Sequence, residues 1–189
     1  MRLQCLLPKT TRDEALKLFK SRLRRLKLGR FLFETGFYIP YYLFRVEVEN
    51  AGKSSTQLLA IDAVTGELDL YGFDAAPEGE ELLEVETMQF GQTALSEEQA
   101  FALLQEKVQR GVYRRQGFFR KADLRVTGKL MKLCYLPYWV GLYERNNQAD
   151  VEVLDAVRGR CEGAKVCELV LQWFTQEAER QRANPATKR

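Results

Sequence analysis

Residues 58–68 read Leu-Leu-Ala-Ile-Asp-Ala-Val-Thr-Gly-Glu-Leu, and residues 151–160 read Val-Glu-Val-Leu-Asp-Ala-Val-Arg-Gly-Arg. In both stretches a short apolar run, typical of a strand, leads into Asp-Ala-Val and then a glycine. An aspartate at such a position can accept hydrogen bonds from the backbone N–H groups that follow it, and glycine tolerates a positive φ. We therefore predict a strand that ends in a tight turn in each copy, with structural roles for Asp62, Gly66, Asp155 and Gly159.

The elements around the two copies also recur in the same order. An aromatic strand with a central proline precedes each copy, at residues 38–42 and 135–139, and a capping box begins at Thr11 and at Ser96. Corresponding positions are 85 residues apart at the capped helices, 97 at the proline strands and 93 at the turns. Because the length differences fall in the connections, this pattern indicates a duplicated unit.

These elements predict an α+β fold with two repeats, each a helix packed on an antiparallel sheet, and a C-terminal helix. We expect the first repeat to cover residues 1–75 and the second to cover residues 83–163. An acidic linker at 76–82 would separate them, and residues 164–189 would form the last helix and a polar tail.

The first capped helix is expected to continue from Thr11 to a stop at Gly29. Five apolar residues at helical spacing predict one stripe that faces the core: Ala15, Leu16, Phe19, Leu23 and Leu26. The opposite face is basic, which is typical of a solvent-exposed helix face.

The composition argues against most catalytic chemistry. The chain has no histidine, and its four cysteines form no Cys-x-x-Cys pair, so His-dependent triads and compact zinc sites are not predicted. We expect no enzyme activity, no catalytic or metal-binding residues and no cofactor. One symmetric carboxylate pair, Asp62 and Asp155, keeps an enzyme as a less favoured alternative, which replacement of both residues by asparagine would test.

Cysteine usage and the N-terminus predict a cytoplasmic protein. Free thiols are typical of a reducing compartment, and Pro8 interrupts the short apolar run at the N-terminus before it reaches the length of a signal peptide. We expect no membrane span, because no apolar run is long enough to cross a bilayer.

Residues 96–100, Ser-Glu-Glu-Gln-Ala, and the later Asp-Ala-Val-x-Gly turn resemble the PepSY domain. The first half resembles it too, most closely at residues 59–67. The resemblance implies a small cystatin-like module in which a helix packs on a hairpin and which binds or inhibits without catalytic residues. Two features depart from the family: PepSY domains are generally extracytoplasmic, and the aromatic-proline strand is similar instead to strands of bacterial proteins that follow a zinc ribbon.

Charge is distributed in blocks, although the net charge is only +3. Residues 1–30 and residues 107–132 each carry a net charge of +8, whereas residues 47–106 carry −13. The basic segments 9–30 and 107–132 could bind nucleic acid or another polyanion, with a candidate patch at Arg114, Arg115, Arg120 and Lys121. Alternatively, the acidic block could neutralise the basic segments within the fold.

The favoured function is a non-catalytic interaction module, such as an accessory or assembly subunit with a protein partner. The candidate contact is an aromatic patch of Tyr41, Tyr138 and Trp139, because large aromatic residues are enriched where proteins bind one another. A buried core position is the competing interpretation for these side chains.

Overall fold

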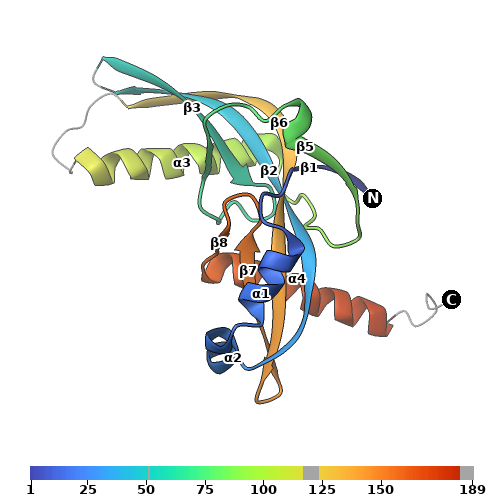
Figure 1. Ribbon diagram of the computed structural model, residues 1–189. Coiled ribbons are helices and arrows are strands. Elements are labelled where there is room, and N and C mark those ends of the chain that lie inside the picture. The colour runs from blue at the N-terminus through green and yellow to red at the C-terminus, as the bar shows by residue number, and fades with distance from the viewer. Residues whose placement is uncertain (51, 117–123, 184–189) are drawn as a thin grey trace. The chain divides into compact units, whose positions relative to one another are not determined.

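The computed structural model describes residues 1–50, 52–116 and 124–183 (Figure 1). Its elements in chain order are β1 (Arg2–Leu6), α1 (Arg12–Phe19), α2 (Arg22–Leu28), β2 (Arg30–Asn50), β3 (Lys53–Asp62), β4 (Tyr71–Phe73), the 3₁₀ turn η1 (Gly79–Glu81), β5 (Leu82–Glu86), α3 (Glu97–Gln116), β6 (Arg125–Arg145), β7 (Gln148–Asp155), β8 (Arg160–Cys161) and α4 (Ala164–Ala183). The strands pair in a mixed sheet, and helices accompany them, so the fold class is α+β as predicted.

The chain folds into two compact units whose boundaries cut across the predicted repeats. The first unit comprises Met1–Leu7 and Ile39–Leu136, and the second comprises Pro8–Tyr38 and Pro137–Arg189. The boundaries fall inside β2 and β6, so each long strand contributes residues to both units.

The predicted linker at 76–82 does not separate the two units. It contains η1 and the start of β5, and β5 pairs antiparallel with β1 from Arg2↔Glu86 to Leu6↔Leu82. This pairing places the acidic segment inside the first unit, because β1 belongs to that unit as well.

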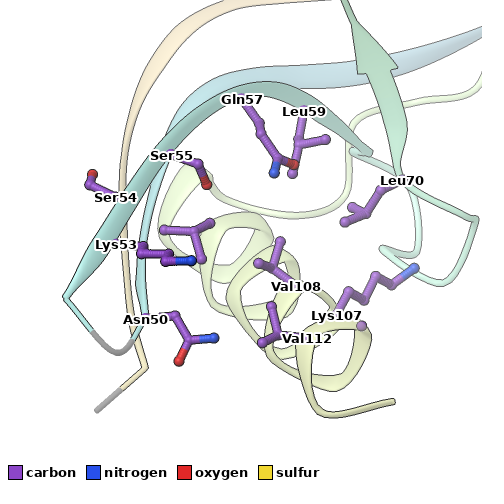
Figure 2. Close-up of a pocket in the computed structure, with 12 residues that line it drawn as sticks. Asn50, Lys53, Ser54, Ser55, Gln57, Leu59, Leu70, Lys107, Val108 and Val112 are labelled. Atoms are coloured by element: carbon purple, nitrogen blue, oxygen red, sulfur yellow. The ribbon is translucent and has the colours of Figure 1, made fainter. Parts of the chain in front are cut away.

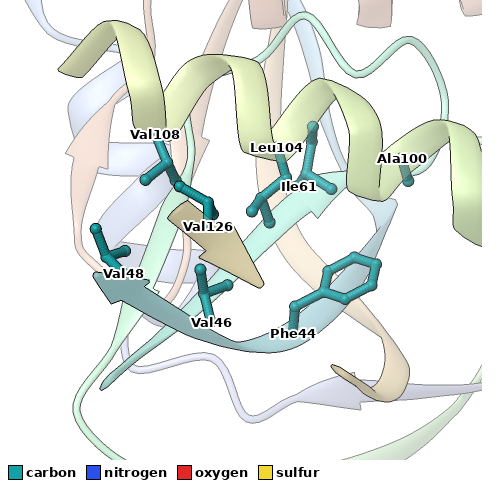
Figure 3. Close-up of a cluster of buried hydrophobic side chains, with 8 residues drawn as sticks. All are labelled: Phe44, Val46, Val48, Ile61, Ala100, Leu104, Val108 and Val126. Carbon is teal, nitrogen blue, oxygen red and sulfur yellow. The ribbon is translucent and has the colours of Figure 1, made fainter. Parts of the chain in front are cut away.

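In the first unit the strand order is β4-β3-β2-β6-β1-β5, and β1 runs parallel to β6 where Cys5 pairs with Tyr135. Strands β2 and β3 form an antiparallel hairpin that begins at Tyr41↔Asp62. Helix α3 packs on this hairpin, with residues spaced by four on the helix meeting residues spaced by two on β2. Figure 3 shows this core: Phe44, Val46, Val48, Ile61, Ala100, Leu104, Val108 and Val126.

In the second unit β6 pairs with β7 through a hairpin, and β8 pairs with β7. The hairpin turn is Asn146-Asn147, where both residues have positive φ, as a tight turn between antiparallel strands requires. The core brings α1 and the hairpin together through Ala15, Phe19, Tyr143 and Leu154. Helix α4 contributes Trp173, whose ring lies 5.1 Å from that of Phe37 in an edge-on contact.

The first capped helix is interrupted, which overturns part of the predicted core stripe. Thr11 and Glu14 form the expected capping box, but α1 ends at Phe19. Ser21 then adopts an extended conformation, with ψ 149°, and α2 starts anew after it. The extended residue changes the rotation of the second helix relative to the first. Leu23 and Leu26 are consequently 78% and 69% exposed instead of buried.

The two turns make the same backbone contact with the proline strands. In the first unit Ala63 N–H donates to the Pro40 carbonyl at 2.8 Å. In the second unit Ala156 N–H donates to the Pro137 carbonyl at 3.1 Å. Tyr41↔Asp62 and Tyr138↔Asp155 are matching strand pairs. The repeated residues therefore form the same local structure twice.

Each turn also binds the segment that precedes a capped helix, and that segment comes from the other half of the sequence. The Ala63 carbonyl accepts from the N–H groups of Ala94 and Leu95, just before α3. The Ala156 carbonyl accepts from Lys9 and Thr10, just before α1. Each unit thus combines the hairpin of one sequence half with the capped helix of the other.

In each unit an aromatic side chain also joins the two sequence halves. Tyr42 donates its hydroxyl hydrogen to the Leu95 carbonyl at 3.2 Å. The corresponding residue of the second half, Trp139, donates from Nε1 to the Thr10 carbonyl at 2.8 Å. These bonds fix the start of each helix against the proline strand of its unit.

Candidate interaction surface

Asp62 organises the turn of the first unit. Its Oδ1 accepts from the backbone N–H of Thr65 at 2.7 Å and of Gly66 at 2.9 Å, and its Oδ2 accepts from Leu68 N–H at 3.0 Å. Gly66 has a φ of +70°, and an added Cβ would collide with Leu103. Because the carboxylate is fully buried and both oxygens bind backbone amides, its geometry serves the turn.

Asp155 has a similar place in the second unit but makes fewer bonds. Its Oδ1 accepts from the N–H groups of Val157 and Arg158, both at 2.8 Å, and Gly159 has a φ of +66°. Oδ2 is buried and has no hydrogen-bond partner among the described residues. The two aspartates are therefore similar in position but unequal in the number of amides they hold.

The predicted aromatic patch is wrong as an exposed surface. Tyr41 and Tyr138 are each only 2% exposed, because the strands on which they lie are covered in the fold. Trp139 is half-buried, and its indole N–H is engaged with the Thr10 carbonyl. The burial of Tyr41 and Tyr138 agrees with the competing interpretation, in which these side chains are core positions.

The predicted polyanion patch is described only in part. Arg114 is exposed on α3, whereas the side chain of Arg115 and the whole of Arg120 and Lys121 lie outside the described residues.

Several lysine and arginine side chains near these positions are bonded to other groups of the first unit. Lys107 donates to the Leu68 carbonyl, Lys132 donates to the Pro77 carbonyl, and Arg110 pairs with Glu106.

One face of α2 is anchored to the second unit. Arg24 pairs with the buried Glu152 of β7, and Leu28, one helical turn further on, packs against the core of α1 and the hairpin. The end of the helix is held as well, since Arg145 Nη1 donates to the Lys27 carbonyl at 3.0 Å. Gly29 follows with a φ of +100°, and any side chain there would collide with the backbone of Glu144.

The opposite face of α2 is exposed and carries both apolar and charged side chains. We define this α2 surface as Arg22, Leu23, Arg25, Leu26 and Lys27, all of which are exposed. Leucine is normally buried by a helix that packs on a core. Here the anchored positions Arg24 and Leu28 hold the helix in a rotation that leaves both leucines outward.

Sequence reasoning missed this surface because it treated residues 11–29 as one helix. The available signal was Ser21, a residue type that favours the start of a helix and here separates the two helices.

The arginines of the basic segment 9–30 form ion pairs with acidic residues of their own unit. Arg12 binds Glu34, Arg24 binds Glu152 and Arg30 binds Glu144. These partners lie in the second unit and outside the acidic block of residues 47–106, which was the alternative source of neutralising charge.

Burial shifts the pKa values of the polar groups that Arg24 contacts. It raises the pKa of Glu152, and the charge of Arg24 offsets part of that rise. Burial also raises the pKa of the Cys161 thiol, which lies next to Glu152 and receives a hydrogen bond from Arg24 at 3.5 Å.

The thiols elsewhere follow the same trend. Burial raises the pKa of Cys5 and of Cys134 to about 11 and also raises that of Cys167. Because the thiolate is the reactive form, these shifts disfavour cysteine nucleophiles near neutral pH.

The chain matches no protein-family model, and neither the curated proteins nor the solved structures contain one that is significantly similar to it. Within the described residues no cluster of three or more histidine, cysteine or acidic side chains could hold a metal ion. None of the helices in that part of the chain combines the length and the apolar character needed to span a membrane.

Proposed function

We propose that this protein is a non-catalytic interaction module that binds a protein partner through the α2 surface. The observation that carries the proposal is the outward position of Leu23 and Leu26 on a helix that is anchored on its other side. The anchoring lowers the entropic cost of binding, because the helix and its rotation are already fixed before the partner arrives.

The chemistry of the surface defines the partner. Leucine side chains gain about 25 cal/mol per Å² when another apolar surface covers them, and a phosphate chain offers little such surface. The flanking Arg22, Arg25 and Lys27 are suited to carboxylates around an apolar centre. We therefore infer a protein partner that presents apolar side chains surrounded by acidic residues.

We also infer that the chain is a duplicated α+β module similar to PepSY, in which the capped helices are exchanged between the sequence halves. The matched turn contacts of Ala63 and Ala156 and the matched donors Tyr42 and Trp139 support this inference. Because the two copies of the module differ, one copy can carry a binding surface that the other lacks. Here the α2 surface belongs to the second unit.

Replacing Leu23 and Leu26 together with serine is expected to weaken partner binding at least about tenfold while leaving stability within about 0.5 kcal/mol. Serine removes apolar surface without changing the charge of α2. The measurement is affinity capture from the native host at matched protein levels, followed by titration of the purified partner. Leu83→Ser with Met88→Ser is the matched control, because these residues are exposed in the first unit.

The same experiment separates the alternatives. Loss of one stoichiometric protein with the α2 variant but not with the control supports the proposal. Nuclease-sensitive capture that both variants retain, and that falls steeply with salt, would instead indicate the polyanion function of segments 9–30 and 107–132. Binding of the chain to anionic lipid vesicles, with no protein partner recovered, would also overturn the proposal.

A further inference from the structure

A cavity of about 510 Å³ lies in the first unit, between the C-terminal part of α3 and the β2–β3 hairpin (Figure 2). Val48 and Val108 are members of the buried core and also line the cavity, so the core opens into it at this end. Leu59, Leu70 and Val112 are half-buried and extend the apolar lining.

Small residues leave this space open on both sides. Gly111 lies on α3 and contributes no side chain, and Ser55 lies on the hairpin side with its small side chain directed toward the helix. A glycine inside a helix costs about 1 kcal/mol relative to alanine. Gly111 is three positions after Val108 and therefore on the same side of α3, so we expect a larger side chain there to enter the cavity.

The charged groups around the cavity are of one sign. Lys53 comes from the hairpin and Lys107 comes from α3, and none of the described residues that line the cavity is acidic. Asn50 and Ser55 add polar groups at the same end of the hairpin, as Figure 2 shows. Lys53 lies beside Asn50 at one end of the cavity, whereas Lys107 lies on the opposite side, where it donates to the Leu68 carbonyl. An apolar lining with Lys53 at one end matches a ligand that is apolar along its length and anionic at that end.

We propose that this cavity binds a small amphipathic carboxylate, such as a medium-chain fatty acid. The apolar chain packs against Leu59, Leu70 and Val112, and the carboxylate pairs with Lys53. Sites for small molecules have volumes of roughly 300–1,000 Å³ and combine apolar walls with a few polar groups, and this cavity meets both conditions. The proposal is independent of the α2 surface, which belongs to the other unit.

Titration calorimetry of the full chain with dodecanoate tests the site. We expect binding that Gly111→Leu weakens at least tenfold, because leucine fills the space that the chain of the ligand occupies. Lys53→Glu should weaken dodecanoate binding at least tenfold but leave binding of the neutral dodecanol within twofold. Lys129→Glu is the matched control, since Lys129 is exposed in the first unit and does not line the cavity.

If Gly111→Leu does not fold, Ser55→Leu fills the cavity from the hairpin instead, and the same tenfold loss is expected. The proposal is overturned if dodecanoate does not bind, or if a folded cavity-filling variant binds it as well as the unaltered chain. It is also overturned if dodecylamine binds as tightly as dodecanoate, because a cationic head should be repelled by Lys53.

Discussion

Asp62→Ala is expected to lower the free energy of unfolding by about 3 kcal/mol. The substitution leaves the N–H groups of Thr65, Gly66 and Leu68 without their acceptor, and the groups of Gly66 and Leu68 are buried. Each unsatisfied buried donor costs about 1–3 kcal/mol, although such costs do not add fully. Asp155→Ala should cost less, about 2 kcal/mol, because that carboxylate holds two amides.

Urea denaturation of the purified variants measures this difference. Asp62→Asn should fall between the wild type and Asp62→Ala, because the amide retains one oxygen acceptor. The exposed Asp69→Ala, in the same loop, is the control and should stay within about 0.5 kcal/mol of the wild type. An Asp62→Ala protein as stable as the wild type would contradict the turn role, and lost turnover of a metabolite with intact folding would point to chemistry.

Arg24→Ala is expected to cost about 3 kcal/mol near neutral pH, because it leaves the Glu152 carboxylate buried without its cation. Burial already raises the pKa of Glu152 above its ordinary value of 4.5, and Arg24 is the main influence that lowers it. Losing Arg24 therefore raises this pKa further.

The sign of the pH dependence follows from that shift. When the pKa is higher in the folded protein than in the unfolded chain, the folded protein binds more protons between the two values, and stability falls as the pH rises through that interval. The deficit of Arg24→Ala should thus be largest above the raised pKa and shrink as the pH falls toward 4.5.

Denaturation curves across a pH series check this expectation. Arg25→Ala is the matched control, because Arg25 is an exposed neighbour on the same helix. Arg24→Leu combined with Glu152→Leu should recover most of the lost stability, since two apolar residues often replace a buried ion pair without cost. A pH-independent deficit, or one shared by Arg25→Ala, would show that the pair does not anchor α2.

Local features of the fold could be predicted from the sequence. The capping boxes at Thr11 and Ser96 and the turns at Asp62 and Asp155 depend on residues within a few positions of one another, and the structure forms all four. The interruption at Ser21 was missed because Leu23 and Leu26 match the spacing of an uninterrupted helix.

Which hairpin each capped helix packs on could not be predicted from local sequence. A capped helix of either half can cover the hairpin of its own half or that of the other, and local patterns are the same in both cases. The contacts that decide it, such as Trp139 with Thr10, join residues 129 positions apart. The cavity was unpredictable for the same reason, since Lys53 and Lys107 come from distant elements.

The exchange of helices has a consequence for synthesis of the chain on the ribosome. Helix α1 is translated before the turn that binds its leading segment, because that turn is at Ala156. The second unit therefore cannot complete its core until β6 and β7 have also left the exit tunnel. The nascent N-terminal segment, basic and rich in leucine, therefore needs protection from aggregation, and a chaperone that shields such segments is expected to associate with it during translation.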